Sequence, residues 1–162
     1  MLIGKEDSML FKATHFTLVA GTGTGHTALN AFDNALQDAG VGDYNLIRVS
    51  SILPPLCKKS IDINVPQGAL LPVAYSSICS ANIGEEIVAA VGIGIPSDSN
   101  NIGVIMEYSS KGTSVDAEKI VKQMVEDAMN NRNIQIADIL LKSCRNIVHN
   151  EYGCAFAAVA LW

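Results

Sequence analysis

The sequence has 162 residues, of which 49% are hydrophobic and 17% charged, and 11 Lys and Arg against 16 Asp and Glu give a net charge of −5. A chain of this length and apolar content forms one folded domain with a sizeable core, which excludes intrinsic disorder. The acidic balance, without a basic cluster, argues against nucleic acid or an anionic membrane as partner. So few charges also predict an oligomer, because a monomer would expose much of its apolar surface.

The N-terminal segment and the short apolar runs both indicate a cytoplasmic protein. Residues 1–10 carry charged side chains in place of the apolar core of a signal peptide, and the longest apolar runs are too short to span a membrane. No C-x-x-C pair or metal-ligand spacing occurs among the cysteines and histidines, which are Cys57, Cys79, Cys144, Cys154, His15, His26 and His149. We therefore expect no metal site and four reduced, buried thiols.

Hydrophobic patterns predict the elements of the first half of the chain. Residues 14–20 (THFTLVA) are typical of a strand, and the glycine-rich stretch 21–25 is expected to be a turn that starts a helix. Apolar residues at steps of three and four predict that helix over 27–39, ended by the next glycine. A second strand is expected over 44–50 (YNLIRVS), followed by an exposed loop to about residue 66.

The second half of the chain combines strands with one long helix. Its expected strands are 69–79, 86–95, 102–108, 134–144 and 153–162. The helix is expected over 114–130, with Thr113 as its cap, Asp116 in its first turn and a continuous apolar face. Two helices against six or more strands predict a layered α/β domain in which the helices cover the faces of the sheets.

The glycines Gly21, Gly23 and Gly25 are one candidate site, because such a loop before a helix can approach a phosphate group. The dinucleotide fingerprint needs a third glycine three positions after the second, where this chain has His26. The next strand also lacks the acidic residue that would bind a ribose. A permissive turn is therefore the preferred interpretation, with a nucleotide-binding module as the alternative.

A pair of serines, Ser50 and Ser51, ends the second expected strand and precedes Ile-Leu-Pro-Pro. Taken alone, two serines before a proline turn are ordinary loop chemistry. The functional interpretation is attack of a serine hydroxyl on the preceding carbonyl, which needs a strained, tightly held peptide and an oxyanion donor.

Two carboxylates are further candidates. Glu107 lies between Met106 and Tyr108 in an apolar strand, where a charge is costly unless it is paired or protonated. A buried glutamate there would be a natural general acid, whereas a side chain on the outer face of the strand would need no role. Asp33 follows Phe32 in the first helix and is, by itself, an ordinary solvent-facing residue.

Together, and in this order, these residues resemble one family, the pyruvoyl-dependent arginine decarboxylases. The resemblance covers nearly the whole chain from about residue 16 and rests on residues 29–36 (LNAFDNAL), 39–55 (AGVGDYNLIRVSSILPP), 68–75 (GALLPVAY), 103–108 (GVIMEY) and 153–162 (GCAFAAVALW). The I-R-V-S-S-I-L-P-P stretch is a specific signal and makes Ser50-Ser51 the best-supported candidate. The fold that the resemblance implies, a layered α/β/β/α sandwich, is compatible with the expected elements.

The resemblance implies a proenzyme that cleaves itself between Ser50 and Ser51, giving chains 1–50 and 51–162. Ser51 would attack the carbonyl of Ser50, and elimination and hydrolysis would leave a pyruvoyl group at the new N-terminus. This covalent group, without metal, PLP or nucleotide, would form a Schiff base with the α-amino group of L-arginine. The products would be CO₂ and agmatine, a precursor for polyamine biosynthesis.

The resemblance also implies roles for single residues. Asn45 would hold the carbonyl during cleavage, Glu107 would protonate the carbanion, and Asp33 would face the substrate guanidinium. The residues expected to line the pocket are Leu29, Leu36, Gly42, Tyr44 and Ile52. The family forms trimers, sometimes paired into hexamers, with sites between subunits. Two alternatives stay open, the same chemistry on another amino acid such as histidine or lysine, and an uncleaved, non-catalytic paralogue.

Overall fold

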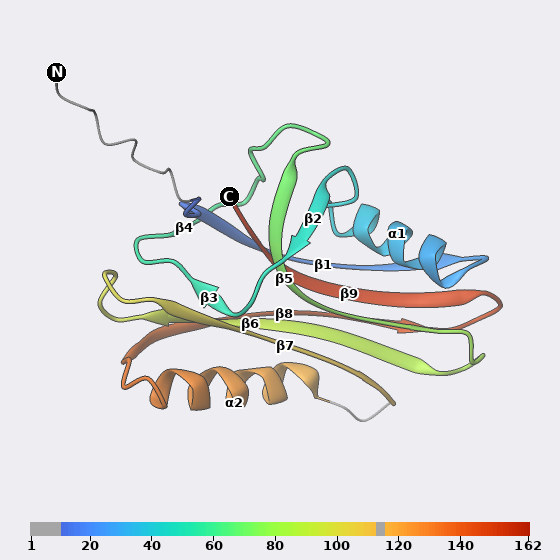
Figure 1. Ribbon diagram of the computed structural model, residues 1–162. Coiled ribbons are helices and arrows are strands. Elements are labelled where there is room, and N and C mark those ends of the chain that lie inside the picture. The colour runs from blue at the N-terminus through green and yellow to red at the C-terminus, as the bar shows by residue number, and fades with distance from the viewer. Residues whose placement is uncertain (1–10, 113–115) are drawn as a thin grey trace, which may run out of the picture.

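A computed structural model describes residues 11–112 and 116–162, which form four layers in the order helix, sheet, sheet, helix (Figure 1). The strands are β1 His15–Gly25, β2 Asn45–Arg48, β3 Ile52–Leu53, β4 Lys58–Lys59, β5 Leu70–Ser80, β6 Glu86–Pro96, β7 Gly103–Lys111, β8 Ile136–Ile147 and β9 Tyr152–Leu161, and the helices are α1 Ala28–Asp38 and α2 Ala117–Asn130. One sheet has the strand order β2-β5-β9-β1-β4 and the other β3-β7-β6-β8. The predicted α/β/β/α sandwich is confirmed.

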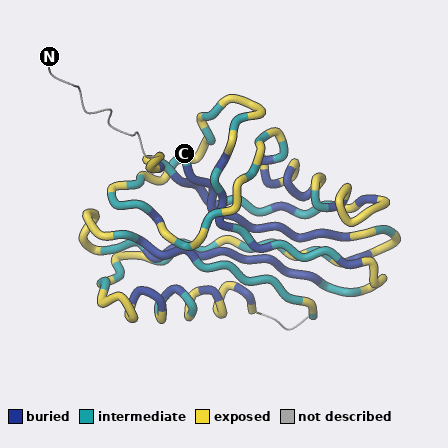
Figure 2. Tube along the Cα trace, viewed as in Figure 1, coloured by how far each residue is buried: buried dark blue, intermediate teal, exposed yellow. Residues whose placement is uncertain are grey.

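Three buried clusters hold the four layers together. The first lies between α1 and the five-stranded sheet, the second between the two sheets, and the third between the four-stranded sheet and α2. The central strand β9 contributes to two of them, because its alternate side chains face opposite sides. Phe156 faces α1, whereas its neighbours Ala155 and Ala157 face the other sheet. Figure 2 shows that this strand is buried along almost its whole length.

The chain passes from one sheet to the other between β2 and β3. Strand β2 runs parallel to β5, with Arg48 opposite Val73. Strand β3 runs antiparallel to β7, with Ile52 opposite Val104. The residues between these strands, 49–51, therefore form a crossing that joins the outer strands of the two sheets (Figure 1). Both serines of the predicted cleavage site lie in this crossing.

The turn predicted over residues 21–25 is wrong, because β1 continues through all of them to Gly25. A Cβ atom at Gly21, Gly23 or Gly25 would lie 2.4, 2.3 or 2.6 Å from backbone atoms of α1. These distances are far below van der Waals contact, so the missing side chains are what allow the helix backbone to rest directly on the strand. The backbone that the nucleotide-binding alternative would offer to a phosphate instead faces a helix.

Both predicted helices are confirmed, with one change at an N-terminus. Thr27 caps α1, since its hydroxyl oxygen accepts the N–H of Asn30 at 3.1 Å. Asp116 caps α2, since its carboxylate accepts the N–H of Lys119 at 3.1 Å. The predicted cap, Thr113, lies outside the described residues.

The cysteines depart from the expectation of four reduced thiols, which is wrong for two of them. Cys79 and Cys154 are directly opposite each other in the β5–β9 register and form a disulfide, with their Cα atoms 4.1 Å apart. Strand pairing brings together two residues that are 75 positions apart in the sequence. Cys57 and Cys144 are free, and burial raises the pKa of each thiol, which favours the protonated, unreactive form.

Candidate active site

The Ser50–Ser51 peptide is anchored on both sides by backbone hydrogen bonds. Before it, the N–H of Val49 donates to the carbonyl of Val73 at 2.9 Å, and after it the N–H of Ile105 donates to the carbonyl of Ser51 at 2.8 Å. The first bond belongs to one sheet and the second to the other. Attack of a hydroxyl on the neighbouring carbonyl needs a restricted geometry, and these two anchors limit the movement of the peptide between them.

Strain was expected at the serine pair, but neither Ser50 nor Ser51 has the positive φ of a left-handed backbone. The non-glycine residues with positive φ in the described ranges are Leu56 and Asn133. Ser50 is exposed and Ser51 is half-buried. A cavity of about 220 Å³ opens beside Ser50, and its walls include Ile52, one of the residues predicted to line the pocket.

Glu107 points into the space between the two sheets. Along β7, Ile105 belongs to the core between the sheets, whereas Met106 and Tyr108 pack on the side of α2. Because side chains alternate along a strand, Glu107 faces the same side as Ile105. Its side chain is 23% exposed. The alternative of an outward-facing, solvated glutamate is therefore wrong.

The carboxylate of Glu107 lies close to the serine crossing. Ile105, whose N–H binds Ser51, is two positions before Glu107 on the same strand and face, which corresponds to about 7 Å. One oxygen of Glu107, Oε1, lies 3.2 Å from a guanidinium nitrogen of Arg48. The other, Oε2, is buried and has no hydrogen-bond partner among the described residues. An acidic side chain with one unpaired oxygen thus lies two residues along β7 from the residue that binds Ser51.

Arg48 is a site residue that the sequence analysis missed. It donates to the carbonyl of Tyr75 at 3.0 Å, and its guanidinium lies 4.6 Å from the centre of the Tyr75 ring. The sequence signal that could have identified Arg48 was its place in the I-R-V-S-S stretch, three residues before Ser51. The ion pair with Glu107 is partly exposed and contributes only about 0–1 kcal/mol to stability.

Asn45 is the first residue of β2, at the far end of that strand from the serines. Its side-chain amide donates to the carbonyl of Gly68 at 2.8 Å, and its backbone N–H donates to Ala69 at 2.9 Å. In the described part of the chain, Asn45 contacts neither serine and fixes the start of β5 instead.

The other predicted pocket residues lie on α1 or shortly after it. Leu29 is 75% exposed, and Asp33, one turn later, is exposed on the same outward face of the helix. Leu36 is buried between α1 and the five-stranded sheet, and Tyr44 packs against that cluster. Gly42 lies close to the Gln37 side chain. Within the described residues, no contact joins this group to Ser51 or Glu107.

The structure therefore divides the predicted site into two groups. The serine group consists of Ser50, Ser51, Ile52 and Glu107, which the crossing and β7 bring together. The helix group consists of Leu29 and Asp33, which lie exposed on α1. Helix α1 packs against β1, β9 and β5, whereas β7 packs against β6, α2 and β5, so the two groups belong to different layers.

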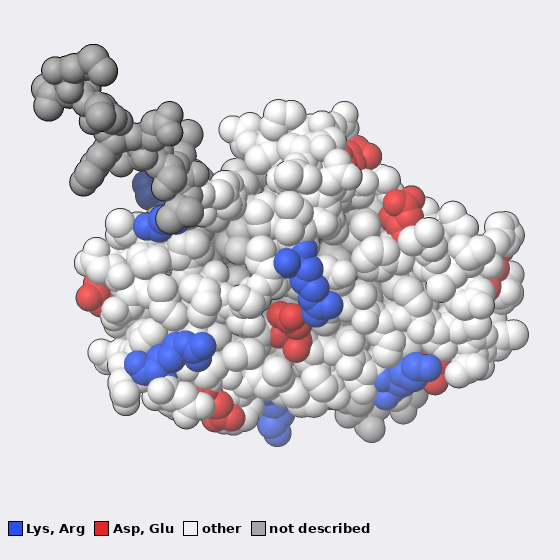
Figure 3. Space-filling model, viewed as in Figure 1, with Lys and Arg blue, Asp and Glu red and all other residues white. Residues whose placement is uncertain are grey.

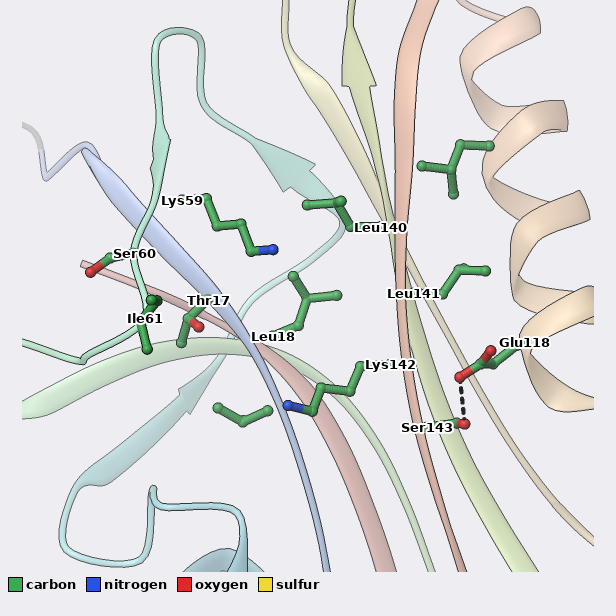
Figure 4. Close-up of a pocket in the computed structure, with 12 residues that line it drawn as sticks. Thr17, Leu18, Lys59, Ser60, Ile61, Glu118, Leu140, Leu141, Lys142 and Ser143 are labelled. Carbon is green, nitrogen blue, oxygen red and sulfur yellow. Dashed lines mark hydrogen bonds between the residues drawn. The ribbon is translucent and has the colours of Figure 1, made fainter.

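A wider cavity, of about 670 Å³, lies at the other edges of the two sheets, between β1 and β4 on one side and β8 on the other. Lys59 and Lys142 line it, and Ser143 donates a hydrogen bond of 2.7 Å to Glu118 there (Figure 4). None of the predicted catalytic residues lines this cavity. The wider cavity and the serine crossing are therefore separate places in the molecule, at opposite edges of the two sheets.

Charge, metal-ligand grouping and helix length add three observations about the described residues. On the face shown in Figure 3, basic and acidic side chains lie singly or beside the opposite charge, and on the visible described surface neither sign gathers into a patch. Over residues 11–112 and 116–162, no three His, Cys, Asp or Glu side chains are grouped to hold a metal ion. Neither α1 nor α2 is long and apolar enough to cross a membrane.

Comparison with known proteins gives the family. The model of the pyruvoyl-dependent arginine decarboxylases matches residues 15–162. The chain belongs to this family. It is 44% identical to the pyruvoyl-dependent arginine decarboxylase of Methanocaldococcus jannaschii and 42% identical to that of Methanococcus vannielii, over 90% of this chain and 88% of each relative. The enzyme of the same name from Pyrococcus furiosus is 38% identical over 90% of this chain and 92% of its own length.

Family membership confirms the predicted class of enzyme, a decarboxylase that depends on a pyruvoyl group. The residues of the serine crossing fit such a group. Ser51 has the hydroxyl from which a keto group can be made, its own carbonyl is fixed by β7, and Glu107 offers an unpaired oxygen nearby. This pyruvoyl-dependent decarboxylase therefore has a serine, an acid and a restricted peptide in one region.

Proposed function

We propose that this chain makes its own pyruvoyl group from Ser51 and decarboxylates L-arginine to agmatine and CO₂. The observation that carries the proposal is the anchored Ser50–Ser51 crossing. Ile105 of β7 binds the carbonyl of Ser51, and Glu107 lies about 7 Å further along the same strand. Family membership and the names of the relatives support the choice of reaction.

Self-cleavage uses the two serines of the crossing. The Ser51 hydroxyl oxygen bonds to the carbonyl carbon of Ser50 while the peptide C–N bond breaks, and the hydroxyl proton passes to the freed nitrogen. Elimination then breaks the new ester, releasing Ser50 as a carboxylate and leaving a double bond in residue 51. Uptake of water and release of ammonia give the keto group. The products are chains 1–50 and 51–162.

Turnover requires a proton donor beside the reacting carbon. The pyruvoyl group supplies a ketone that condenses with the substrate amino group and accepts the electrons left behind by CO₂. Glu107 then gives a proton to the substrate carbon, a task for which its unpaired Oε2 is suited. Ile52, the residue after Ser51, would give the site an apolar wall, which favours loss of a charged carboxylate as neutral CO₂.

Recognition of arginine is proposed to come from a second copy of the chain. Asp33 can form a paired, charge-assisted hydrogen bond with the substrate guanidinium. It lies exposed on α1 with Leu29, away from Ser51 of the same chain. An exposed leucine beside an exposed aspartate is suited to a surface that another subunit covers. We therefore assign each active site to an interface in a homotrimer, which the resemblance also implies.

Intact mass spectrometry of freshly purified protein, combined with a decarboxylation assay, tests the proposal. We expect one species ending at Ser50 and another lighter by one ammonia than a chain that begins with Ser51. Arginine should release CO₂ and agmatine, whereas lysine, ornithine and histidine should be poor substrates. A single full-length mass would refute the pyruvoyl assignment for this chain. Cleaved protein that prefers another amino acid would retain the chemistry and overturn only the substrate.

A further inference from the structure

The two oxygens of the Glu107 carboxylate are in different surroundings. Oε1 faces Arg48 at 3.2 Å, whereas Oε2 is buried and has no hydrogen-bond partner among the described residues. A carboxyl group that donates a proton needs one oxygen to carry it, and the oxygen engaged by a cation is the less suitable of the two. The contact with Arg48 therefore determines which oxygen of Glu107 is left for proton transfer.

Arg48 is itself fixed by two contacts with one residue. A guanidinium nitrogen donates to the Tyr75 carbonyl at 3.0 Å, while the group lies over the Tyr75 ring at 4.6 Å. A planar guanidinium with several N–H groups can stack and donate in two directions at once, which a lysine ammonium cannot do in the same way. The Tyr75 ring is in turn packed against Phe32 and Phe156. The cation is thus held by a partly buried aromatic cluster.

We infer that Arg48 is a positioning residue that holds Glu107 by Oε1 and leaves Oε2 to deliver the proton. This inference rests on the proposed function. A role in stability alone does not account for the contacts, because the Arg48 side chain is 58% exposed and an ion pair at that exposure adds little to folding. The inference adds a residue outside the serine pair and the acid to the machinery of turnover.

Three variants separate positioning from general effects of charge. Arg48→Met keeps an unbranched stem similar to that of arginine and removes the guanidinium. Arg48→Lys keeps the charge without the planar group, and Arg145→Met is the matched control. Arg145 pairs with Glu86, a second arginine–glutamate pair of similar exposure, between β8 and β6. Its loss removes the same kind of interaction from a region that contains no proposed site residue.

Steady-state kinetics with arginine should show the effect in kcat, normalised to the amount of cleaved chain. A general acid contributes about 10²–10⁴-fold to rate, and we expect Arg48→Met to lose about 10-fold or more of kcat as part of that contribution. KM should change little, because Arg48 acts on Glu107 and not on the substrate. Arg48→Lys should recover part of kcat, and Arg145→Met should match the unaltered enzyme.

A second readout does not depend on turnover. A carbodiimide labels accessible carboxyl groups, and the labelling of Glu107 can be followed by peptide mass spectrometry on the purified enzyme without substrate. Release from Arg48 should speed labelling of Glu107 several-fold in Arg48→Met and leave it unchanged in Arg145→Met. Equal labelling rates in all variants would contradict the contact itself.

The outcomes distinguish this inference from the proposed function. An unaltered enzyme that fails to cleave or to release CO₂ from arginine overturns the proposed function. An active unaltered enzyme with normal kcat in Arg48→Met overturns the positioning role alone. A rise in KM without a fall in kcat also overturns it, because Arg48 would then bind the substrate. If both Arg48 variants fold but remain uncleaved, the role is likewise refuted, since the arginine would act in maturation.

Discussion

The serine group and the helix group differ in how the fold holds them. Ser51 and Glu107 are joined through the backbone, because the chain crosses between sheets and hydrogen-bonds to β7 beside the acid. Leu29 and Asp33 lie exposed on the outer face of α1, in a different layer from Ser51 and Glu107. The difference teaches that one copy of the chain holds the proposed reactive residues by backbone pairing and leaves the proposed recognition residues exposed on a helix.

The two groups also depend on different devices in the sequence. The serine group relies on strand pairing, which fixes backbone atoms through hydrogen bonds. The helix group relies on close contact, because α1 can rest on β1 only where that strand lacks side chains. Changes in the first group should therefore affect chemistry, whereas changes in the second should affect substrate binding and the position of the helix.

The largest effect is expected from Ser51→Ala, which removes the hydroxyl needed for cleavage. The chain should stay full-length, as seen by intact mass, and decarboxylation should fall by at least about 10⁶-fold, the lower range of enzymatic rate enhancement. Thermal unfolding should be nearly unchanged and serves as the control for folding. Normal cleavage in this variant would place the reactive centre elsewhere, and the serine group would then have no special role in the chemistry.

Glu107→Gln should separate maturation from turnover within the serine group. Glutamine keeps the shape of the side chain but cannot donate a carboxyl proton, so cleavage should proceed while kcat falls by about 10²–10⁴-fold. Intact mass and the rate of CO₂ release measure the two steps independently. A variant that is fully active would show that another group supplies the proton.

Asp33→Asn should weaken arginine binding while leaving cleavage intact. A hydrogen bond to a charged group is worth about 1.5–3 kcal/mol, so kcat/KM for arginine should fall by about 10- to 100-fold, mainly through KM.

Co-expression of Asp33→Asn with Glu107→Gln sharpens the comparison. If each site takes Asp33 from one chain and Glu107 from another, mixed oligomers contain some intact sites and regain part of the activity. If both residues serve the site of a single chain, no mixture can restore it. Each variant expressed alone provides the baseline activity. A mixture without restored activity would mean that each site lies within one chain.

Gly23→Ala should have the smallest effect, exerted through the position of α1. The added Cβ would lie 2.3 Å from the Ala31 carbonyl oxygen, so the helix must shift, at a cost of about 1–3 kcal/mol in the free energy of unfolding. Calorimetry should show a lower Tm, with a modest rise in KM for arginine and unchanged cleavage. Thr24→Ala, at an exposed position of the same strand, is the matched control.

The sequence was sufficient to predict the layers of this fold but not the structural role of the glycines at 21–25. Periodic apolar residues predicted both helices and most of the strands, because burial imposes that spacing. The 21–25 stretch misled, since glycine is favoured both in turns and where a helix backbone touches a strand. The two cases differ in whether another element packs on the glycines. Here that element is α1, and a local sequence pattern does not show that contact.

The candidate site was predictable in kind but not in arrangement. Ser50, Ser51 and Glu107 were candidates from residue type and position, and the resemblance implied their roles. The proximity of Glu107 to Arg48 depends on strand register across 59 positions of sequence, as the Cys79–Cys154 disulfide depends on register across 75. Contacts of that range leave no local periodicity to detect.

The crossing between the sheets has a consequence for the life of the mature protein. Cleavage there would put β1, α1 and β2 on one piece, and the partners of β1 and β2, β9 and β5, on the other. The pieces would stay interlocked in the native state, yet once unfolded they would have to find each other in solution. Rebuilding one subunit would then depend on protein concentration, whereas each uncleaved precursor chain could rebuild both of its sheets without meeting another chain.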